Sequence, residues 1–167
     1  MQFPCYSKDC LILPPTPVEL ESIGKLADLA VAAGPAHPAW GYFQFVKGLA
    51  EYRQGHGAAA IEWLKNINPS RDWPRAVEVQ MVLALAQHQL QQFEAARATL
   101  SRGLQLAADK LGDADRTDLD DTWNDWLIAR CLLREARAAV SGTAGNAPAS
   151  TPPQRAGGGP AAKAPGD

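Results

Sequence analysis

The sequence predicts an all-α protein built from antiparallel helix-turn-helix pairs, with about seven helices and a C-terminal capping helix. The first observation is internal similarity, because an offset of 36 residues aligns segment 39–64 with segment 75–100. The second is that apolar residues recur every three or four positions, which is the period of an α-helix. A repeat length in the thirties is typical of helical repeat arrays.

The positions that coincide between the two segments are small or apolar. The aligned pairs are Gly48 with Ala84, Leu49 with Leu85, Ala50 with Ala86, Ala60 with Ala96 and Leu64 with Leu100. Small residues let two helix backbones approach closely, and the larger residues fill the grooves between them. Gly55 is predicted to end the first helix of the first segment in the left-handed conformation.

These residues resemble the tetratricopeptide repeat. The first unit carries Gly48, Tyr52, Gly55, Ala60, Leu64 and Pro69, and the second carries Leu83, Ala84, Phe93, Ala96 and Leu100. The first unit departs from the family pattern at Lys47, where Leu is usual, and at Gly57, where an aromatic residue is usual. In the second unit His88 stands opposite Tyr52. The resemblance implies an α-solenoid in which the first helices of successive units line a concave face.

Helical periodicity and turn signals place the individual elements. Helices are expected at 18–33, 38–54, 57–67, 73–90, 93–108 and 118–140. The first of these is the second helix of an incomplete earlier unit, and 112–117 is a polar linker. Residues 1–17 form an irregular lead-in or the end of a truncated helix. The repeat domain therefore spans 18–140, and the Ala/Gly/Pro-rich residues 141–167 are expected to be disordered.

The last predicted helix is the candidate cap of the array. Acidic residues begin it and basic residues end it, which complements the helix dipole at both ends: Asp118, Asp120 and Asp121, then Arg130, Arg134 and Arg137. Its expected buried residues are Trp123, Trp126, Leu127 and Leu133. A terminal element of this kind covers the last apolar face of a repeat array.

No arrangement of residues indicates catalysis, a cofactor or a metal. The three histidines lie in different segments, without a ligand at helical spacing: His37, His56 and His88. The net charge of −2 gives no basic excess for nucleic acid. No apolar run approaches the roughly 20 residues of a membrane span, and no secretory signal begins the chain. We therefore expect a cytoplasmic protein that is not an enzyme.

The resemblance implies a partner-binding groove on the first helix of each unit. Its residues are Tyr42, Phe45, Leu49, Tyr52 and Arg53 from the first unit, with Glu78, Met81, Leu85, His88 and Gln89 from the second. They follow one stripe of each helix. Aromatic, Arg and Met side chains favour peptide binding. The alternative is that the N-terminal helix or the C-terminal cap covers this stripe and makes it core.

The function expected from this organisation is a non-catalytic scaffold that binds a peptide or protein partner through the concave face. Over residues 8–140 the chain is also similar to the C-terminal repeat region of large bacterial serine/threonine protein kinases. The alternative function is therefore a regulatory or vestigial kinase tail, since the kinase motifs themselves are absent. A homodimer is a further expectation, because small arrays with an uncovered end face tend to associate.

Overall fold

The computed structural model describes residue 11 and residues 16–67, 73–114 and 123–142. These residues form six helices and no strand, so the prediction of an all-α protein is confirmed. The helices are α2 (Pro17–Val31), α3 (Trp40–Arg53), α4 (Gly57–Leu64), α5 (Trp73–Gln89), α6 (Phe93–Ala114) and α7 (Trp123–Gly142). The predictions for most of the lead-in, for Asp118, Asp120 and Asp121 and for the tail after 142 lie outside the described residues.

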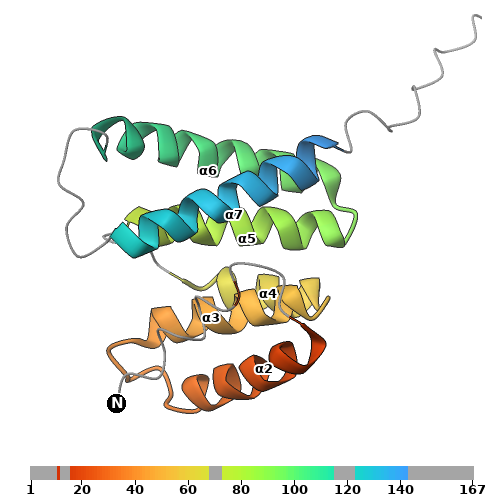
Figure 1. Ribbon diagram of the computed structural model, residues 1–167, viewed down its shortest axis with the longest axis vertical. Coiled ribbons are helices and arrows are strands. Elements are labelled where there is room, and N and C mark those ends of the chain that lie inside the picture. The colour runs from red at the N-terminus through yellow and green to blue at the C-terminus, as the bar shows by residue number, and fades with distance from the viewer. Residues whose placement is uncertain (1–10, 12–15, 68–72, 115–122, 143–167) are drawn as a thin grey trace, which may run out of the picture.

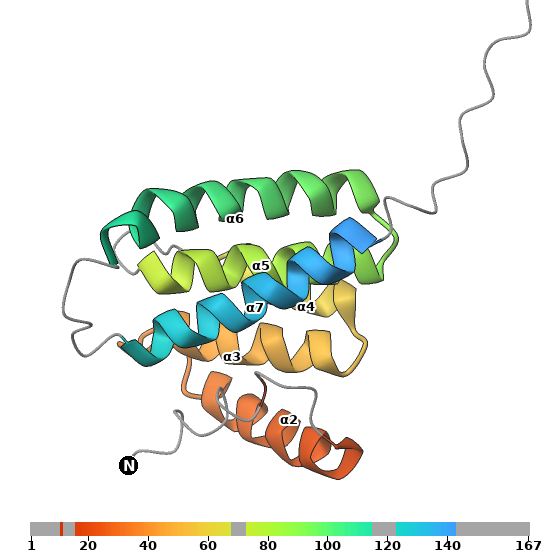
Figure 2. The same cartoon turned by 45° about the horizontal axis from the view of Figure 1, so that its top comes forward.

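The helices stack in the order of the chain, and α7 then turns back along the stack. Helix α2 packs on α3, α3 on α4, α4 on α5 and α5 on α6. Figure 1 shows α2 at one end of this stack and α6 at the other. Helix α7 lies against both α5 and α6, and Figure 2 shows it crossing α5 obliquely. Helix α7 therefore covers one side of α5. From the sequence alone, this side could be either an open groove or part of the core.

The turns between paired helices have the same geometry in both units. Gly55 follows α3 with a φ of 84°, and Gln91 follows α5 with a φ of 60°. Each turn contains the two hydrogen bonds of a Schellman cap: Gly55 N to Tyr52 O (3.0 Å), His56 N to Glu51 O (2.9 Å), Gln91 N to His88 O (2.9 Å) and Gln92 N to Gln87 O (2.9 Å). Every one of these positions is related by the 36-residue offset, so the internal similarity includes the turn.

Replacing Gln91 with glycine is expected to raise the free energy of unfolding by roughly 0.5–1 kcal/mol. A residue with a Cβ is strained at positive φ, and glycine removes that strain. The reverse change in the matched turn, Gly55→Ala, should lower the free energy of unfolding. Urea unfolding followed by circular dichroism measures both variants. If both variants changed the free energy of unfolding in the same direction, the two turns would not be equivalent.

Two glycines mark close approaches between neighbouring helices. A Cβ built on Gly48 of α3 would lie 2.6 Å from Cγ of Leu64 on α4. A Cβ on Gly57 of α4 would lie 3.1 Å from the backbone oxygen of Ala86 on α5. The absence of a side chain at Gly57 thus allows α4 to lie close to the α5 backbone.

One hydrophobic cluster runs through the whole stack. It includes Leu11, residues of α2 such as Ile23, and residues of every helix from α3 to α7. Its largest fully buried apolar side chains are Leu11, Phe45, Leu49, Leu64, Met81, Leu85, Ile128, Leu132, Val77 and Val82. Because the cluster is continuous, the described helices share one core.

Two predictions for the C-terminal part were wrong. Helix α6 continues to Ala114, whereas the sequence was expected to form a linker from 112, because a single glycine weakens a helix without ending it. Leu127 was expected in the core but is 51% exposed. The buried side of α7 instead carries Ile128, Ala129, Leu132, Ala136 and Val140. Trp126 and Leu133 are partly buried against this core.

Candidate interaction site

The ten residues predicted to line a groove divide by exposure. Five lie in the interior, with at most 2% of their surface exposed: Phe45, Leu49, Glu78, Met81 and Leu85. Tyr42, Tyr52, Arg53 and His88 are partly buried, and Gln89 is exposed. At the five interior positions the structure corrects the expectation of an open groove. Four of these residues belong to the core cluster, and α7 packs against α5 on the side that we call the inner side of the stack.

Tyr52 and Arg53 of α3 meet Glu135 of α7 on this inner side. Arg53 donates from Nη1 to Glu135 Oε1 (2.5 Å) and from Nη2 to Oε2 (2.8 Å), which is a bidentate ion pair. The Tyr52 hydroxyl donates to Glu135 Oε1 at 3.1 Å. The Arg53 side chain is only 5% exposed and that of Glu135 is 29% exposed. We call these three side chains the Arg53 seat.

The Arg53 seat also contacts Leu11, a residue that is distant in sequence. Arg53 Nε donates to the backbone oxygen of Leu11 at 2.9 Å. Leu11 itself has no exposed surface and belongs to the core cluster. The guanidinium therefore binds a carboxylate through its two terminal nitrogens and a main-chain carbonyl through Nε. Sequence reasoning missed Glu135 and Leu11 because no local spacing connects them to Arg53.

The phenol of Tyr52 stays protonated at neutral pH. Burial, together with the nearby Glu135 carboxylate, raises the pKa of Tyr52 to about 12. The hydroxyl is therefore a hydrogen-bond donor to Glu135, and the Arg53 guanidinium carries a fixed positive charge.

A second cluster of charges joins α2 to α3. Lys47 Nζ lies 2.6 Å from Asp28 Oδ1 and 2.5 Å from Glu51 Oε1, and Glu51 Oε2 lies 2.8 Å from His56 Nδ1. Burial alone would lower the pKa of Lys47, but the two carboxylates outweigh it and raise that pKa. Burial would likewise raise the pKa of Glu51, and the hydrogen bonds from Lys47 and His56 reverse this. Lys47 thus forms an ionic link between two helices.

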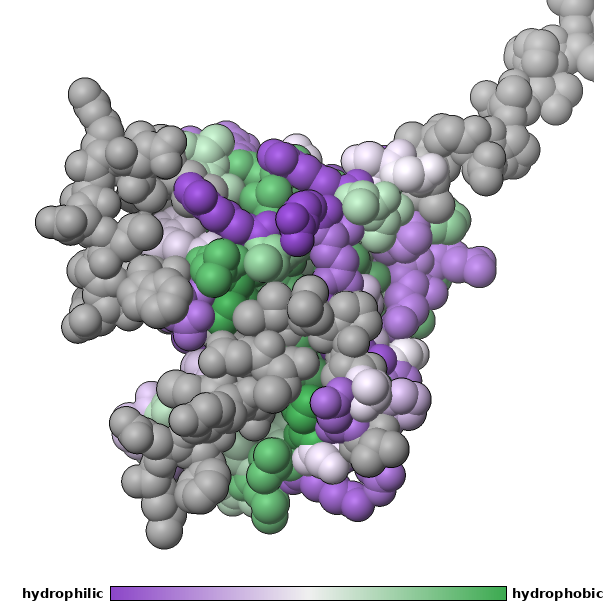
Figure 3. Space-filling model, in the orientation of Figure 1, coloured by the Kyte–Doolittle hydropathy of each residue, from purple (hydrophilic) through white to green (hydrophobic). Residues whose placement is uncertain are grey.

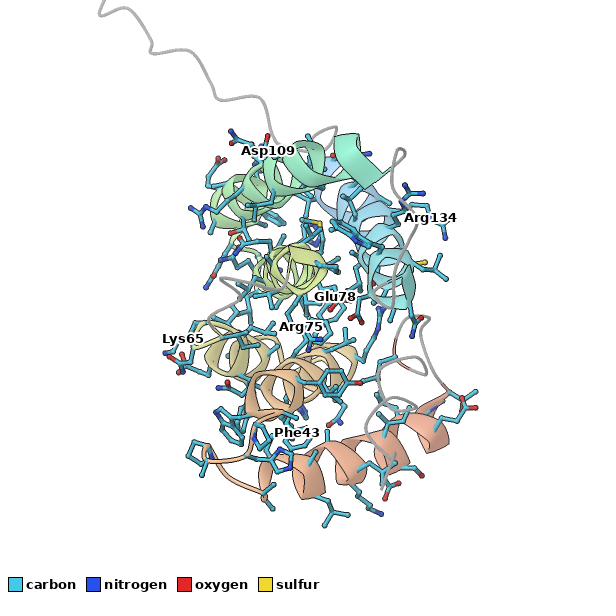
Figure 4. All side chains as sticks on the ribbon, turned by 90° about the vertical axis from the view of Figure 1, so that its left-hand side faces the viewer. Phe43, Lys65, Arg75, Glu78, Asp109 and Arg134 are labelled. Carbon is cyan, nitrogen blue, oxygen red and sulfur yellow. The ribbon has the colours of Figure 1, made fainter. Side chains whose placement is uncertain are left out.

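Arg75 and Glu78 of α5 place charged groups in the interior. The Arg75 guanidinium lies 4.8 Å from the ring centre of Tyr42 and 4.0 Å from Asp125 Oδ2 of α7. Figure 4 shows Arg75 and Glu78 inside the stack, whereas Lys65, Asp109 and Arg134 point outward. Tyr42, which was predicted to line the groove, therefore packs beneath a buried guanidinium.

The exposed apolar side chains lie at the edges of the stack. Leu26 (46%) and Leu29 (70%) project from α2, while Leu90 and Phe93 (38% each) flank the turn between α5 and α6. In Figure 3, hydrophobic side chains, coloured green, project from the lower end of the molecule, where α2 lies. The predicted groove residue His88 meets Phe93 in an edge-to-face contact, with ring centres 5.4 Å apart.

Neither a metal site nor a membrane-spanning helix occurs within the described residues. No three His, Cys, Asp or Glu side chains of 11, 16–67, 73–114 and 123–142 lie where they could hold a metal ion. None of the helices described there is both long and apolar enough to cross a bilayer.

Comparison of the chain with protein-family models, with curated proteins and with solved structures finds no match. The contacts of the Arg53 seat and its surroundings therefore carry the functional proposal.

Proposed function

We propose that the chain is a non-catalytic protein–protein interaction module of the tetratricopeptide type, which binds a peptide segment of its partner on the inner side of the stack. The all-helical stack supports this proposal, as do the matching turns at Gly55 and Gln91. The close contact at Gly48 lies where the repeat family also has its small residue. In such an array a partner segment lies along the first helices of the units, here α3 and α5.

The observation that carries the proposal is the way in which the Arg53 seat holds Leu11. One large aliphatic side chain is fully buried and its main-chain carbonyl accepts a hydrogen bond from Arg53. Peptide-binding proteins commonly combine main-chain hydrogen bonds with a pocket for a side chain. Because Glu135 fixes the guanidinium in place, little side-chain entropy is lost when a segment binds.

The surface next to the Arg53 seat offers further contacts to a partner. Gln89 Nε2 reaches the backbone oxygen of Tyr52 at 3.5 Å, so the end of α5 lies beside the end of α3. His88, Leu90 and Phe93 continue this edge with partly exposed rings and an aliphatic side chain. Of the predicted groove residues that keep exposed surface, Tyr52, Arg53, His88 and Gln89 lie at this edge, whereas Tyr42 lies near the start of α3.

The alternative function, a regulatory or vestigial tail of a bacterial serine/threonine kinase, stays a prediction from the sequence. Nothing in the described residues favours it over an interaction module. A charged substitution at the predicted groove residue Met81 would not test binding. Met81 has no exposed surface, so the charge would disrupt the core.

Panning a phage-displayed library of random peptides tests the proposed function. The library is panned in parallel on the wild-type chain and on the full chain with Leu11→Asp, because Leu11 fills the seat in the native structure. We expect enriched peptides that share a large aliphatic residue. Isothermal titration of these peptides into an Arg53→Lys variant should show binding about tenfold weaker, because Lys keeps the charge but lacks the planar set of donors.

The matched control is Arg97→Lys, which makes the same change at an arginine on α6 whose side chain is 47% exposed. This variant should bind the enriched peptides as the wild-type chain does. The proposal fails if neither form of the chain enriches a peptide, or if Arg53→Lys binds the enriched peptides unchanged.

A further inference from the structure

We infer that Leu11 is an intramolecular ligand of the Arg53 seat, so that the chain competes with its partner for its own binding site. This inference rests on the proposed function and adds the regulation of the same site. It starts from the contact between Leu11 and Arg53, which are 42 residues apart in the chain.

The contact to Leu11 is one that another segment can replace. Arg53 Nε binds the main-chain oxygen of Leu11, and every residue of a partner peptide has the same carbonyl group. The remaining requirement is an aliphatic side chain that can be buried as completely as that of Leu11. The kind of partner that fits is therefore a peptide with a large aliphatic residue and an accessible carbonyl.

The seat itself does not depend on Leu11. The ion pair from Arg53 to Glu135 and the hydrogen bond from Tyr52 to Glu135 join α3 to α7 directly. Neither interaction uses an atom of Leu11. The site is thus preformed, and its occupant can exchange.

A tethered occupant competes strongly because its effective concentration is in the millimolar range for short linkers. The apparent dissociation constant of a partner equals its intrinsic dissociation constant divided by the fraction of molecules in which the tethered residue has left the site. Weakening the internal contact should therefore strengthen binding of a peptide added in trans.

Fluorescence anisotropy with a labelled synthetic peptide tests the inference. The peptide has the sequence of residues 6–16, with serine in place of Cys10 to avoid disulfides. It is titrated with the full wild-type chain and with the full chain carrying Leu11→Asp. We expect Leu11→Asp to bind the peptide at least about tenfold more tightly, because the charged side chain cannot occupy the apolar position.

Leu29→Asp is the matched control, since it adds the same charge at a leucine that is 70% exposed. This variant should bind the peptide no better than the wild-type chain. In the Leu11→Asp background, Arg53→Lys should remove most of the gain. Circular dichroism checks the fold, and Leu11→Ala replaces Leu11→Asp if helicity is lost, with a smaller gain expected.

Equal binding by the wild-type and Leu11→Asp chains would overturn the inference, as would no binding to Leu11→Asp. Either result leaves the proposed function standing if the peptides selected from the library still depend on Arg53. Loss of both signals would instead count against the proposed function. A gain that survives Arg53→Lys would show that the peptide binds elsewhere and would also overturn the inference.

Discussion

Replacing Arg53 with methionine is expected to lower the free energy of unfolding by roughly 2–4 kcal/mol. The change keeps much of the side-chain volume but leaves the Glu135 carboxylate, which is only 29% exposed, without its bidentate partner. It also removes the donor to the backbone oxygen of Leu11. Urea unfolding of the full chain measures the loss. A smaller slope of the transition would indicate that α7 separates before the rest of the stack.

A double-mutant cycle isolates the contribution of the ion pair. The losses in free energy of unfolding from Arg53→Met alone and from Glu135→Leu alone should add to more than the loss in the double variant. We expect the difference, which is the coupling energy, to be about 2 kcal/mol. Lys25→Met is the matched control, because Lys25 forms an ion pair with Glu21 on α2 in which both side chains are largely exposed. Pairs of this kind contribute little to stability. If Arg53→Met cost no more than Lys25→Met, the seat would have no structural role.

Replacing Gly48 with alanine is expected to lower the free energy of unfolding by roughly 1–3 kcal/mol. Alanine is the better helix former, so the sign of the change depends on the contact between α3 and α4. The added methyl group would lie 2.6 Å from Cγ and 2.7 Å from Cδ2 of Leu64. Leu64 is 1% exposed, so moving its side chain would disturb the residues packed around it. Thermal unfolding followed by circular dichroism provides the measurement.

Gly41 offers the matched control on the same helix. A Cβ built there meets nothing within 4 Å, so Gly41→Ala should raise the free energy of unfolding by up to about 1 kcal/mol. A second check is Leu64→Ala in the Gly48→Ala background, which should cost less than Leu64→Ala alone because the new methyl group fills part of the cavity. A gain in stability from Gly48→Ala would contradict the close approach of the two helices.

The positions of the helices could be predicted from the sequence to within a few residues, except at the end of α6 and the start of α7. The small residues Gly48 and Ala84 were recognised as coincident positions, and Gly48 does lie at the tightest contact between α3 and α4. Gly55 was predicted as a left-handed cap, and its φ of 84° confirms this. These features are local, since they depend on residues a few positions apart on one helix or in one turn.

The candidate site was predicted only in part. Tyr52 and Arg53 were assigned to a binding stripe, but Glu135 and Leu11, which complete the Arg53 seat, were not. Leu49 and Tyr52 lie on one stripe of α3, yet the first is core and the second hydrogen bonds to α7. Helical periodicity places residues on a face but does not say what covers that face.

By itself, the sequence determined that the chain forms paired helices with a left-handed cap at Gly55, because helix periodicity, small residues and glycine caps act over short distances. Only the tertiary structure decided which side of α5 is buried, that Leu127 is exposed while Ile128 is core, and that Arg53 meets both Glu135 and Leu11. Each of these features depends on where α7 and Leu11 lie in the stack. Contacts between residues so far apart in the chain leave no periodic signal in the sequence.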